Sequence, residues 1–268
     1  KMSKSLGNSP DLLEMIEKDG ADAVRFGIMI SSPAGNDLMW DPSGNEQGRF
    51  FINKMWNALK LVKMWEGRIQ PGADSQEPGV KSRESGVGSQ DTNGHFTIDW
   101  FENRLREVRQ ELDGQFKEFR LSEALKTTYS LIWDDFCSWY LEWVKPGFEQ
   151  PIDARVYRET VRFFEELMQL LHPFMPFVTE EIYQQLQKQE TDLTIKTYSP
   201  AGNTDTRLLS AGSLLKEVIT AIRDARNKAQ LKPKDSIVLH IQTEQQENYE
   251  SIASILAKQV NATGIHFT

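Results

Sequence analysis

The sequence predicts a mainly α-helical protein, in which an antiparallel helical bundle follows a short loop-and-helix segment and precedes a small α/β unit. Apolar residues recur at helical spacing through most of residues 46–186. Glycine and proline interrupt these stretches at 145–147 and 173–176. After Leu193, shorter runs alternate between apolar and polar residues, as strands do. Long helices joined by short turns favour an antiparallel bundle.

Two short helices and one long helix are expected before the bundle closes. Ser9 and Pro10 are typical of a helix cap and a first helical position, and Gly20 is a good C-terminal residue. A second helix is expected over 21–31. A third begins near Glu46, because its apolar residues recur every three or four positions, at Ile52, Met55, Leu59 and Val62.

Residues 71–94 are rich in glycine, proline and serine, so they are predicted to form a flexible surface loop. Three long helices follow: one over 98–112, one from a cap at Ser122 to 143, and one from about 153 to 171. A fourth begins near Pro176. The aromatic stripe of the second helix predicts core packing rather than base stacking, and Trp139 lies off it; the stripe comprises Leu125, Tyr129, Ile132, Trp133, Phe136, Tyr140 and Trp143.

The C-terminal region is predicted to mix helices and strands. Strands are expected over 192–200 and 236–241, helices over 214–230 and 247–260, and the start of a further strand over 264–268. The chain is therefore divided into three segments: 1–43, a loop and connecting helices; 44–198, the bundle; and 199–268, a small α/β unit that we expect to be truncated.

Composition narrows the class of protein. The net charge is −8, which argues against nucleic-acid binding by bulk charge, so any RNA contact has to come from local basic patches. No apolar run approaches the ~20 residues of a membrane helix, and no membrane partner is expected. One cysteine, Cys137, fits a cytoplasmic setting. The four histidines show no metal-ligand spacing, so no metal site is predicted.

The first residues, KMSKSLGN, carry the strongest chemical motif. Lys1 and Lys4 are mobile positive charges suited to phosphate oxygens, and they stand beside the hydroxyls of Ser3 and Ser5. Gly7 allows the sharp turn that would close such a loop over a polyphosphate. A solvated basic terminus is the alternative.

KMSKS followed by LGN resembles the second signature of class I aminoacyl-tRNA synthetases. Residues 10–41 are similar to the segment that follows this loop in the enzymes for valine, isoleucine and leucine. Within them, SSPAGNDL resembles the valine enzymes more than the other two. Further similar stretches, which belong to the bundle and the junction after it in that family, are 46–62, 131–146, 170–186 and 222–241.

The resemblance implies a function in tRNA charging. It implies that Lys4, supported by Lys1, Ser3 and Ser5, binds ATP with Mg²⁺ and assists aminoacyl-adenylate formation. It implies that the bundle binds the anticodon region of tRNA(Val). The family's first signature, His-x-Gly-His, is missing. We therefore expect a C-terminal fragment, inactive alone and without tightly bound ATP, that works with upstream catalytic and editing domains. The isoleucine enzyme and a non-catalytic helical RNA-binding module remain alternatives.

Basic residues are the candidates for tRNA contact. One group clusters near the end of the helix expected over 214–230, where Ile222 and Ala225 are expected to be buried; it comprises Arg223, Arg226, Lys228, Lys232 and Lys234. The same spacing would suit an ordinary solvated face. Weaker candidates lie at the start of the bundle, at Arg49, Asn53 and Lys54. A third patch, Arg104, Arg106 and Arg109, is offset by Glu102, Glu107 and Glu111.

Other chemically suggestive residues are given structural roles. Cys137 lies within the aromatic helix and is expected to be buried and inert. Glu180 and Glu181 are expected to stabilise a helix N-terminus. His172 is expected to bond a backbone carbonyl at a helix end.

Overall fold

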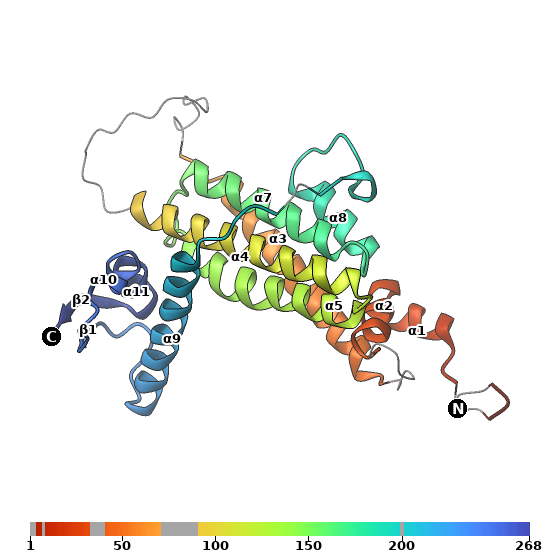
Figure 1. The fold of residues 1–268 in the computed structure, drawn as a ribbon, viewed down its shortest axis with the longest axis horizontal. Coiled ribbons are helices and arrows are strands. Elements are labelled where there is room, and N and C mark those ends of the chain that lie inside the picture. Colours follow the sequence, from red (N-terminus) through yellow and green to blue (C-terminus); the bar gives the residue numbers. More distant parts are fainter. Residues whose placement is uncertain (1–3, 7–8, 33–40, 71–90, 199–200) are drawn as a thin grey trace. The chain divides into compact units, whose positions relative to one another are not determined.

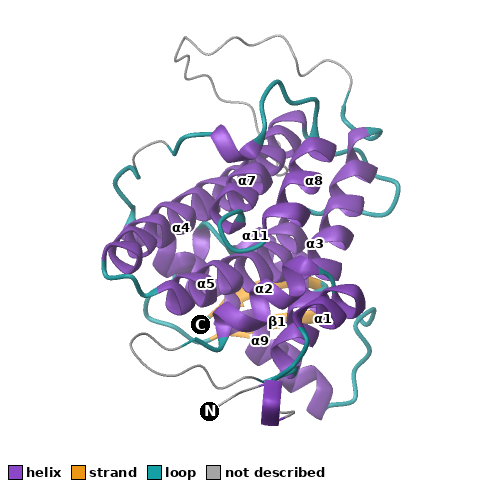
Figure 2. Cartoon of the chain, turned by 90° about the vertical axis from the view of Figure 1, so that its right-hand side faces the viewer, coloured by secondary structure: helices purple, strands orange, loops and turns teal. Residues whose placement is uncertain are grey.

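The computed structural model describes residues 4–6, 9–32, 41–70, 91–198 and 201–268. Helices make up most of this part of the chain (Figure 1), and the strands are confined to one C-terminal pair, drawn in orange in Figure 2. The mainly α prediction is therefore confirmed. Within the described residues, no helix combines the length and the apolar character that crossing a membrane requires.

The chain divides into two compact units, each with its own core. The first unit consists of Lys1–Gly67, Val108–Cys137 and Thr160–Ala201; the second consists of Arg68–Glu107, Ser138–Glu159 and Gly202–Thr268. Three helices therefore have residues in both units. The expected domain boundaries, after residue 43 and after residue 198, divide the chain by expected function rather than by compactness. They stay a prediction.

The first unit opens with helices α1, Leu12–Asp19, and α2, Ala21–Ile30, followed by α3, Ser43–Glu66. Asp11, not Ser9, caps α1: its carboxylate accepts the N–H of Leu13 at 2.8 Å. Gly20 ends α1 with a φ of 87°, as predicted.

Helices α2 and α3 approach closely because glycines face each other at their crossing. A Cβ atom added to Gly27 would lie 2.8 Å from the backbone nitrogen of Asn45, and one added to Gly48 would lie 3.0 Å from the Cα of Ala23. Side chains at these positions would separate the two backbones, so the crossing depends on their absence.

The bundle helices are α4, Asp91–Lys117; α5, Leu121–Ser130; η2, Leu131–Tyr140; α6, Leu141–Val144; α7, Ala154–Leu171; and α8, Pro176–Leu186. The predicted apolar stripe of α4 is buried at every position. The predicted stops are also confirmed: Lys145 follows the last residue of α6, and Pro176 is the first residue of α8.

Three details of the bundle differ from the prediction. Residues 91–94, expected in the loop, form the first turn of α4, and residues 71–90 lie outside the described part of the chain. Ser122 does not cap a helix; it lies inside α5, and its hydroxyl donates to the carbonyl of Ile30 at 3.0 Å. The helix expected from Ser122 to 143 contains a π-helical stretch, η2, between α5 and α6.

After α8 the chain forms a short 3-10 turn, η3, Leu193–Ile195. The strand predicted over 192–200 is wrong for its described residues. Leu193 is buried, and its N–H donates to the Glu180 carboxylate at 2.9 Å. A side chain on α8 therefore accepts the hydrogen bond that a neighbouring strand would accept in a sheet.

The second unit ends in a small α/β arrangement. Its elements are α9, Thr206–Lys228; β1, Ile237–Ile241; α10, Glu247–Glu250; α11, Ala253–Val260; and β2, Ala262–Phe267. Strands β1 and β2 pair in parallel, which requires the crossover that α11 provides. Ile237, Leu239 and Ile241 share the more buried side of β1, as predicted.

Candidate nucleic-acid interface

The N-terminal lysine motif is only partly within the described chain. Lys1 and Ser3 lie outside the described residues, whereas Lys4 and Ser5 belong to a short 3-10 turn, η1, Lys4–Leu6. Ser5 is exposed. The ATP-binding role of this motif stays a prediction.

Helix α3 presents one of the predicted RNA-contacting groups in the first unit. Arg49 and Asn53 are four residues apart and therefore lie on one side of the helix, where both are exposed. The Arg49 guanidinium is 52% exposed and makes one long ion pair, 3.4 Å from the Asp19 carboxylate. The Lys54 ammonium lies 5.2 Å from the centroid of the Trp133 ring, so the aromatic face holds this cation in place.

Phe50, which the clustering of charge does not single out, belongs to the same face. It is 57% exposed, whereas its neighbour Phe51 is completely buried. The helical phase of the buried residues Phe51, Met55 and Leu59 is the signal that places Phe50 outside. Phe50, Arg49, Asn53 and Lys54 are called the α3 face below. It combines positive charge, an amide and an aromatic ring, which is the chemistry that binds unpaired nucleotides.

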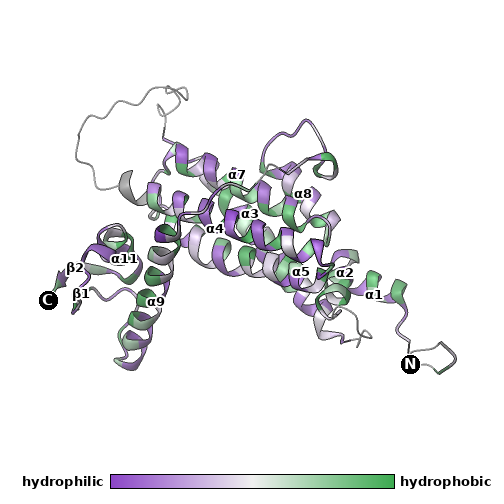
Figure 3. Cartoon of the chain, in the orientation of Figure 1, coloured by the Kyte–Doolittle hydropathy of each residue, from purple (hydrophilic) through white to green (hydrophobic). Residues whose placement is uncertain are grey.

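The second unit carries the other predicted group, at the C-terminal end of α9 and in the loop after it. This end of α9 is strongly hydrophilic (Figure 3). The exposed cations Arg223, Lys228, Lys232 and Lys234 are called the junction patch below. Arg223 contacts the face of Trp139, its carbon Cζ lying 5.8 Å from the ring centroid. Trp139, predicted to be exposed or to meet a neighbouring helix, is half-buried.

Arg226 does not belong to the exposed group, which corrects the prediction. Its side chain is buried, with 7% of the residue exposed, and it donates hydrogen bonds to backbone carbonyls. Ala225, expected to be buried, is exposed instead. The helix therefore turns Arg226 inward, where backbone carbonyls hold its guanidinium.

The third basic patch is neutralised by carboxylates. Arg104 lies 2.5 Å from Glu107, Arg106 lies 3.0 Å from Glu102, and Arg109 lies 3.5 Å from Glu166. Glu111, expected to offset this patch, instead accepts hydrogen bonds from Gln115 and Thr127. The ion pairs make this patch a weaker attractor for phosphate than the other two.

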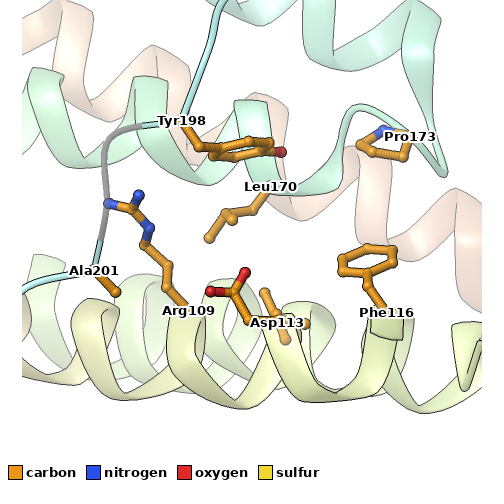
Figure 4. A pocket seen from close by; sticks show the side chains of 8 residues that line it. Arg109, Asp113, Phe116, Leu170, Pro173, Tyr198 and Ala201 are labelled. Atoms are coloured by element: carbon orange, nitrogen blue, oxygen red, sulfur yellow. The ribbon is translucent and has the colours of Figure 1, made fainter. Parts of the chain in front are cut away.

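A hollow of about 490 Å³ lies in the first unit between α4, α7 and the segment after η3. Figure 4 shows the Arg109 and Asp113 side chains next to each other on α4, with the Tyr198 ring across from them. Phe116, Leu112 and Leu170 supply apolar walls. Because the polar groups carry both signs of charge, the hollow does not favour a phosphate.

Burial gives Cys137 the inert role that the sequence predicts. It raises the pKa of the thiol to about 12, so the thiol stays protonated at neutral pH. Among the described residues, no group of three or more histidine, cysteine or acidic side chains could hold a metal ion.

Glu180 and His172 are structural, with partners other than those expected. Glu180 lies beyond the first turn of α8 and accepts from Leu193. His172 bonds the hydroxyls of Thr179, at 2.8 Å, and Thr194, at 2.9 Å, rather than a carbonyl. Glu181, also beyond the first turn, accepts from Gln185 one turn later.

Comparison with known proteins identifies the fold. Residues 99–242 match the family described as "Anticodon-binding domain of tRNA ligase", and residues 1–41 match "tRNA synthetases class I (I, L, M and V)". Among solved structures, the Agrobacterium radiobacter K84 LeuRS–tRNA–LeuAMS complex matches with a TM-score of 0.50 and 19% identity, covering 78% of this chain and 23% of that one.

Several curated relatives carry the name valine–tRNA ligase. The protein from Porphyromonas gingivalis is 44% identical over 94% of this chain and 27% of its own length. The protein from Parabacteroides distasonis is 41% identical over 99% of this chain and 28% of its own length. The protein from Christiangramia forsetii is 38% identical over 100% of this chain and 29% of its own length. The chain therefore spans little more than a quarter of the length of these relatives.

The helical fold and the two family matches define a domain of the type found in class I tRNA synthetases. The chain belongs to the anticodon-binding domain family of tRNA ligases.

Proposed function

We propose that this chain is the anticodon-binding portion of a valine–tRNA ligase, which joins valine to tRNA(Val) through an aminoacyl-adenylate made from ATP. The observation that carries this proposal is the 38–44% identity to proteins of that name over 94–100% of the chain. A cytoplasmic location goes with this function and with the free, buried thiol of Cys137.

The α3 face supports contact with the anticodon loop. Nucleotides in a loop are unstacked, so their bases can lie on an aromatic ring while their phosphates meet cations. Phe50 is an exposed ring of this kind, and Arg49 and Lys54 supply the charge. In this proposal Asn53 hydrogen-bonds a base edge, because its amide both donates and accepts.

The junction patch is proposed to contact the phosphate backbone of the same tRNA. Lys228, Lys232 and Lys234 are exposed. Their charge is therefore available to RNA phosphates.

In the whole enzyme, the KMSKS segment is proposed to act on ATP together with the upstream catalytic domain. Lys4, Lys1, Ser3 and Ser5 would contact the phosphates, and Mg²⁺ would accompany ATP. Lys4→Ala in the whole enzyme is expected to slow ATP–pyrophosphate exchange with valine by ~10²–10³, the scale of losing one preorganised contact to developing charge. An unchanged exchange rate would remove Lys4 from the chemistry.

The anticodon role is tested on the chain itself with fluorescently labelled tRNA(Val). Arg49→Gln with Lys54→Gln is expected to weaken binding and to lower the slope of log K against log salt by about 1.5, because each lost phosphate contact contributes ~0.7–0.9. Lys117→Gln, which removes an exposed charge elsewhere, is the control. If both variants bind like the unchanged chain, the α3 face does not contact tRNA.

A further inference from the structure

Arg226 gathers three backbone carbonyls from two separate segments. Its Nη1 donates to the carbonyl of Val260, at the end of α11, at 3.0 Å. Its Nη2 donates to the carbonyl of Asp235 at 2.7 Å and also to that of Lys232. One guanidinium therefore ties the loop after α9 to the end of α11.

The Arg226 guanidinium is buried, and its hydrogen bonds in the described part of the chain go to backbone carbonyls rather than to a carboxylate. The nearby carboxylate of Asp235 serves a different bond, accepting the N–H of Lys232 at 2.8 Å. Burying a charge is costly, and an apolar side chain of similar volume often stabilises a fold equally well. The bonds of Arg226 to the loop therefore indicate a role in fixing the geometry of that loop.

Hydrogen bonds and a proline ring restrain the backbone of residues 232–235. The N–H of Asp235 donates to the carbonyl of Lys232 at 3.0 Å, which closes a tight turn. The side-chain amide of Asn261 donates to the carbonyl of Lys234 at 2.8 Å. Pro233 fixes its own φ within the turn. The side chains of Lys232 and Lys234 are the cationic groups of this turn, and both residues are exposed, as Pro233 between them is.

The turn is joined to α9 by a second set of bonds. Gln230 adopts a φ of 57°, the left-handed conformation that ends many helices. The N–H of Leu231 then donates to the carbonyl of Arg226 at 3.0 Å. Arg226 thus holds the loop at both ends, through its backbone at Leu231 and through its side chain at Lys232 and Asp235.

We propose that Arg226 is a positioning residue that fixes the 232–235 turn and thereby presents Lys232 and Lys234 to the phosphate backbone of tRNA. This inference rests on the proposed function of the junction patch. A preorganised turn binds more tightly because less conformational freedom is lost when the complex forms. Arg226 itself does not touch the RNA.

A double-mutant cycle on the whole chain tests this positioning role with labelled tRNA(Val). Lys232→Gln with Lys234→Gln is expected to weaken binding and to lower the salt slope by about 1.5. Arg226→Met is expected to weaken binding severalfold in the unchanged chain and to have no further effect once both lysines are replaced. Arg207→Met, which removes an exposed charge at the other end of α9, is the matched control.

Each outcome is informative. Equal losses from Arg226→Met with and without the two lysines would show a general effect on the protein and overturn the positioning role. Unchanged affinity on Arg226→Met would overturn it as well. If replacing the lysines leaves both the affinity and the salt slope unchanged, the proposed function of the junction patch is contradicted. The positioning role of Arg226 is then contradicted as well, because it rests on that function.

A second variant keeps the test decisive if Arg226→Met unfolds the second unit, which circular dichroism would reveal. Asn261 has a left-handed φ of 53°, so Asn261→Gly preserves the backbone while removing the amide that holds Lys234. It is expected to weaken tRNA binding only when Lys234 is present. A loss that persists after Lys234→Gln would overturn the presentation of lysines by a fixed turn.

Discussion

Asp22 links helix α2 to the start of α8. Its carboxylate accepts the backbone N–H of Val178 at 2.6 Å and that of Phe177 at 3.4 Å. Helix α8 has no capping side chain at Met175, so a residue far away in the sequence takes that role. Local sequence signals identify caps only among neighbouring residues, which is why this one could not be predicted.

Stability is expected to depend on pH through Asp22. Burial raises the pKa of its carboxyl group, although the N–H groups of Val178 and Phe177 and the charge of Arg25 oppose the rise. A raised folded-state pKa means that the stabilisation is present below the unfolded value of about 3.9 and is lost as pH rises through the folded value. The unchanged chain should therefore gain stability relative to Asp22→Asn as the pH falls from about 7 to about 4.

Urea unfolding of both proteins across this range measures the difference. Asp11→Asn is the control, because Asp11 caps α1 at an exposed position. A constant stability difference between the unchanged chain and Asp22→Asn would contradict a raised pKa.

Cys137 is expected to resist alkylation in the folded chain. Its thiol is buried with a pKa of about 12, so little thiolate forms at neutral pH and reagents cannot reach it. Iodoacetamide should modify the urea-unfolded chain readily and the native chain hardly at all, as measured by mass spectrometry. Equal rates in the two states would show that the aromatic helix opens easily.

Element boundaries followed from the sequence wherever the signal is local. Gly20, Asp153 and Pro176 mark helix ends in the structure as they do in the sequence. Helix α9 begins at Thr206, eight residues before its predicted start, because its cap, Asp205, lies in a stretch without apolar periodicity.

The π-helical stretch η2 shows what periodicity cannot supply. The apolar spacing of residues 122–143 predicts a single α-helix with one buried stripe, but Leu131 and Asp135 are buried as well. A π-helix changes the angular spacing of side chains, and its presence depends on the helices packed around it rather than on local preference. Of the predicted stripe, Leu125, Ile132, Phe136, Tyr140 and Trp143 are buried, whereas Tyr129 and Trp133 are half-buried. The widening of the buried face could not be predicted.

Opposite effects are predicted for two glycine substitutions, one at the crossing of α2 and α3 and one on the exposed side of α4. In Gly27→Ala the new methyl group would lie 2.8 Å from the backbone nitrogen of Asn45, so unfolding free energy should fall by about 1–3 kcal/mol. In Gly114→Ala the methyl group meets nothing within 4 Å inside α4, so stability should rise by up to about 1 kcal/mol. Denaturant titration measures both; a neutral Gly27→Ala would mean that the crossing adjusts freely.

At the scale of the whole molecule, the candidate interface was predictable in kind but not in every member. Clustering of positive charge found Lys228, Lys232 and Lys234, which are exposed. Clustering of charge also placed Arg226 in this group. It does not reveal that the Arg226 side chain is buried and donates to three backbone carbonyls. Phe50 was missed because an apolar residue beside a buried one is ordinarily assigned to the core.

The net charge of −8 makes the salt dependence of tRNA binding a test of the whole interface. The overall field of the protein repels RNA, and in the proposed interface attraction comes from the six exposed or partly exposed cations of the α3 face and the junction patch: Arg49, Lys54, Arg223, Lys228, Lys232 and Lys234. At ~0.7–0.9 per phosphate contact, the slope of log K against log salt should not be steeper than about −5.

Fluorescence anisotropy between about 50 and 200 mM salt gives this slope. Replacing the lysines of the junction patch and the cations of the α3 face should lower it in separate, additive steps, because the two groups contact different parts of the RNA. A slope much steeper than about −5 would require phosphate contacts that neither group supplies. A slope near zero would mean that stacking on Phe50 and hydrogen bonds to bases, rather than phosphate contacts, hold the tRNA.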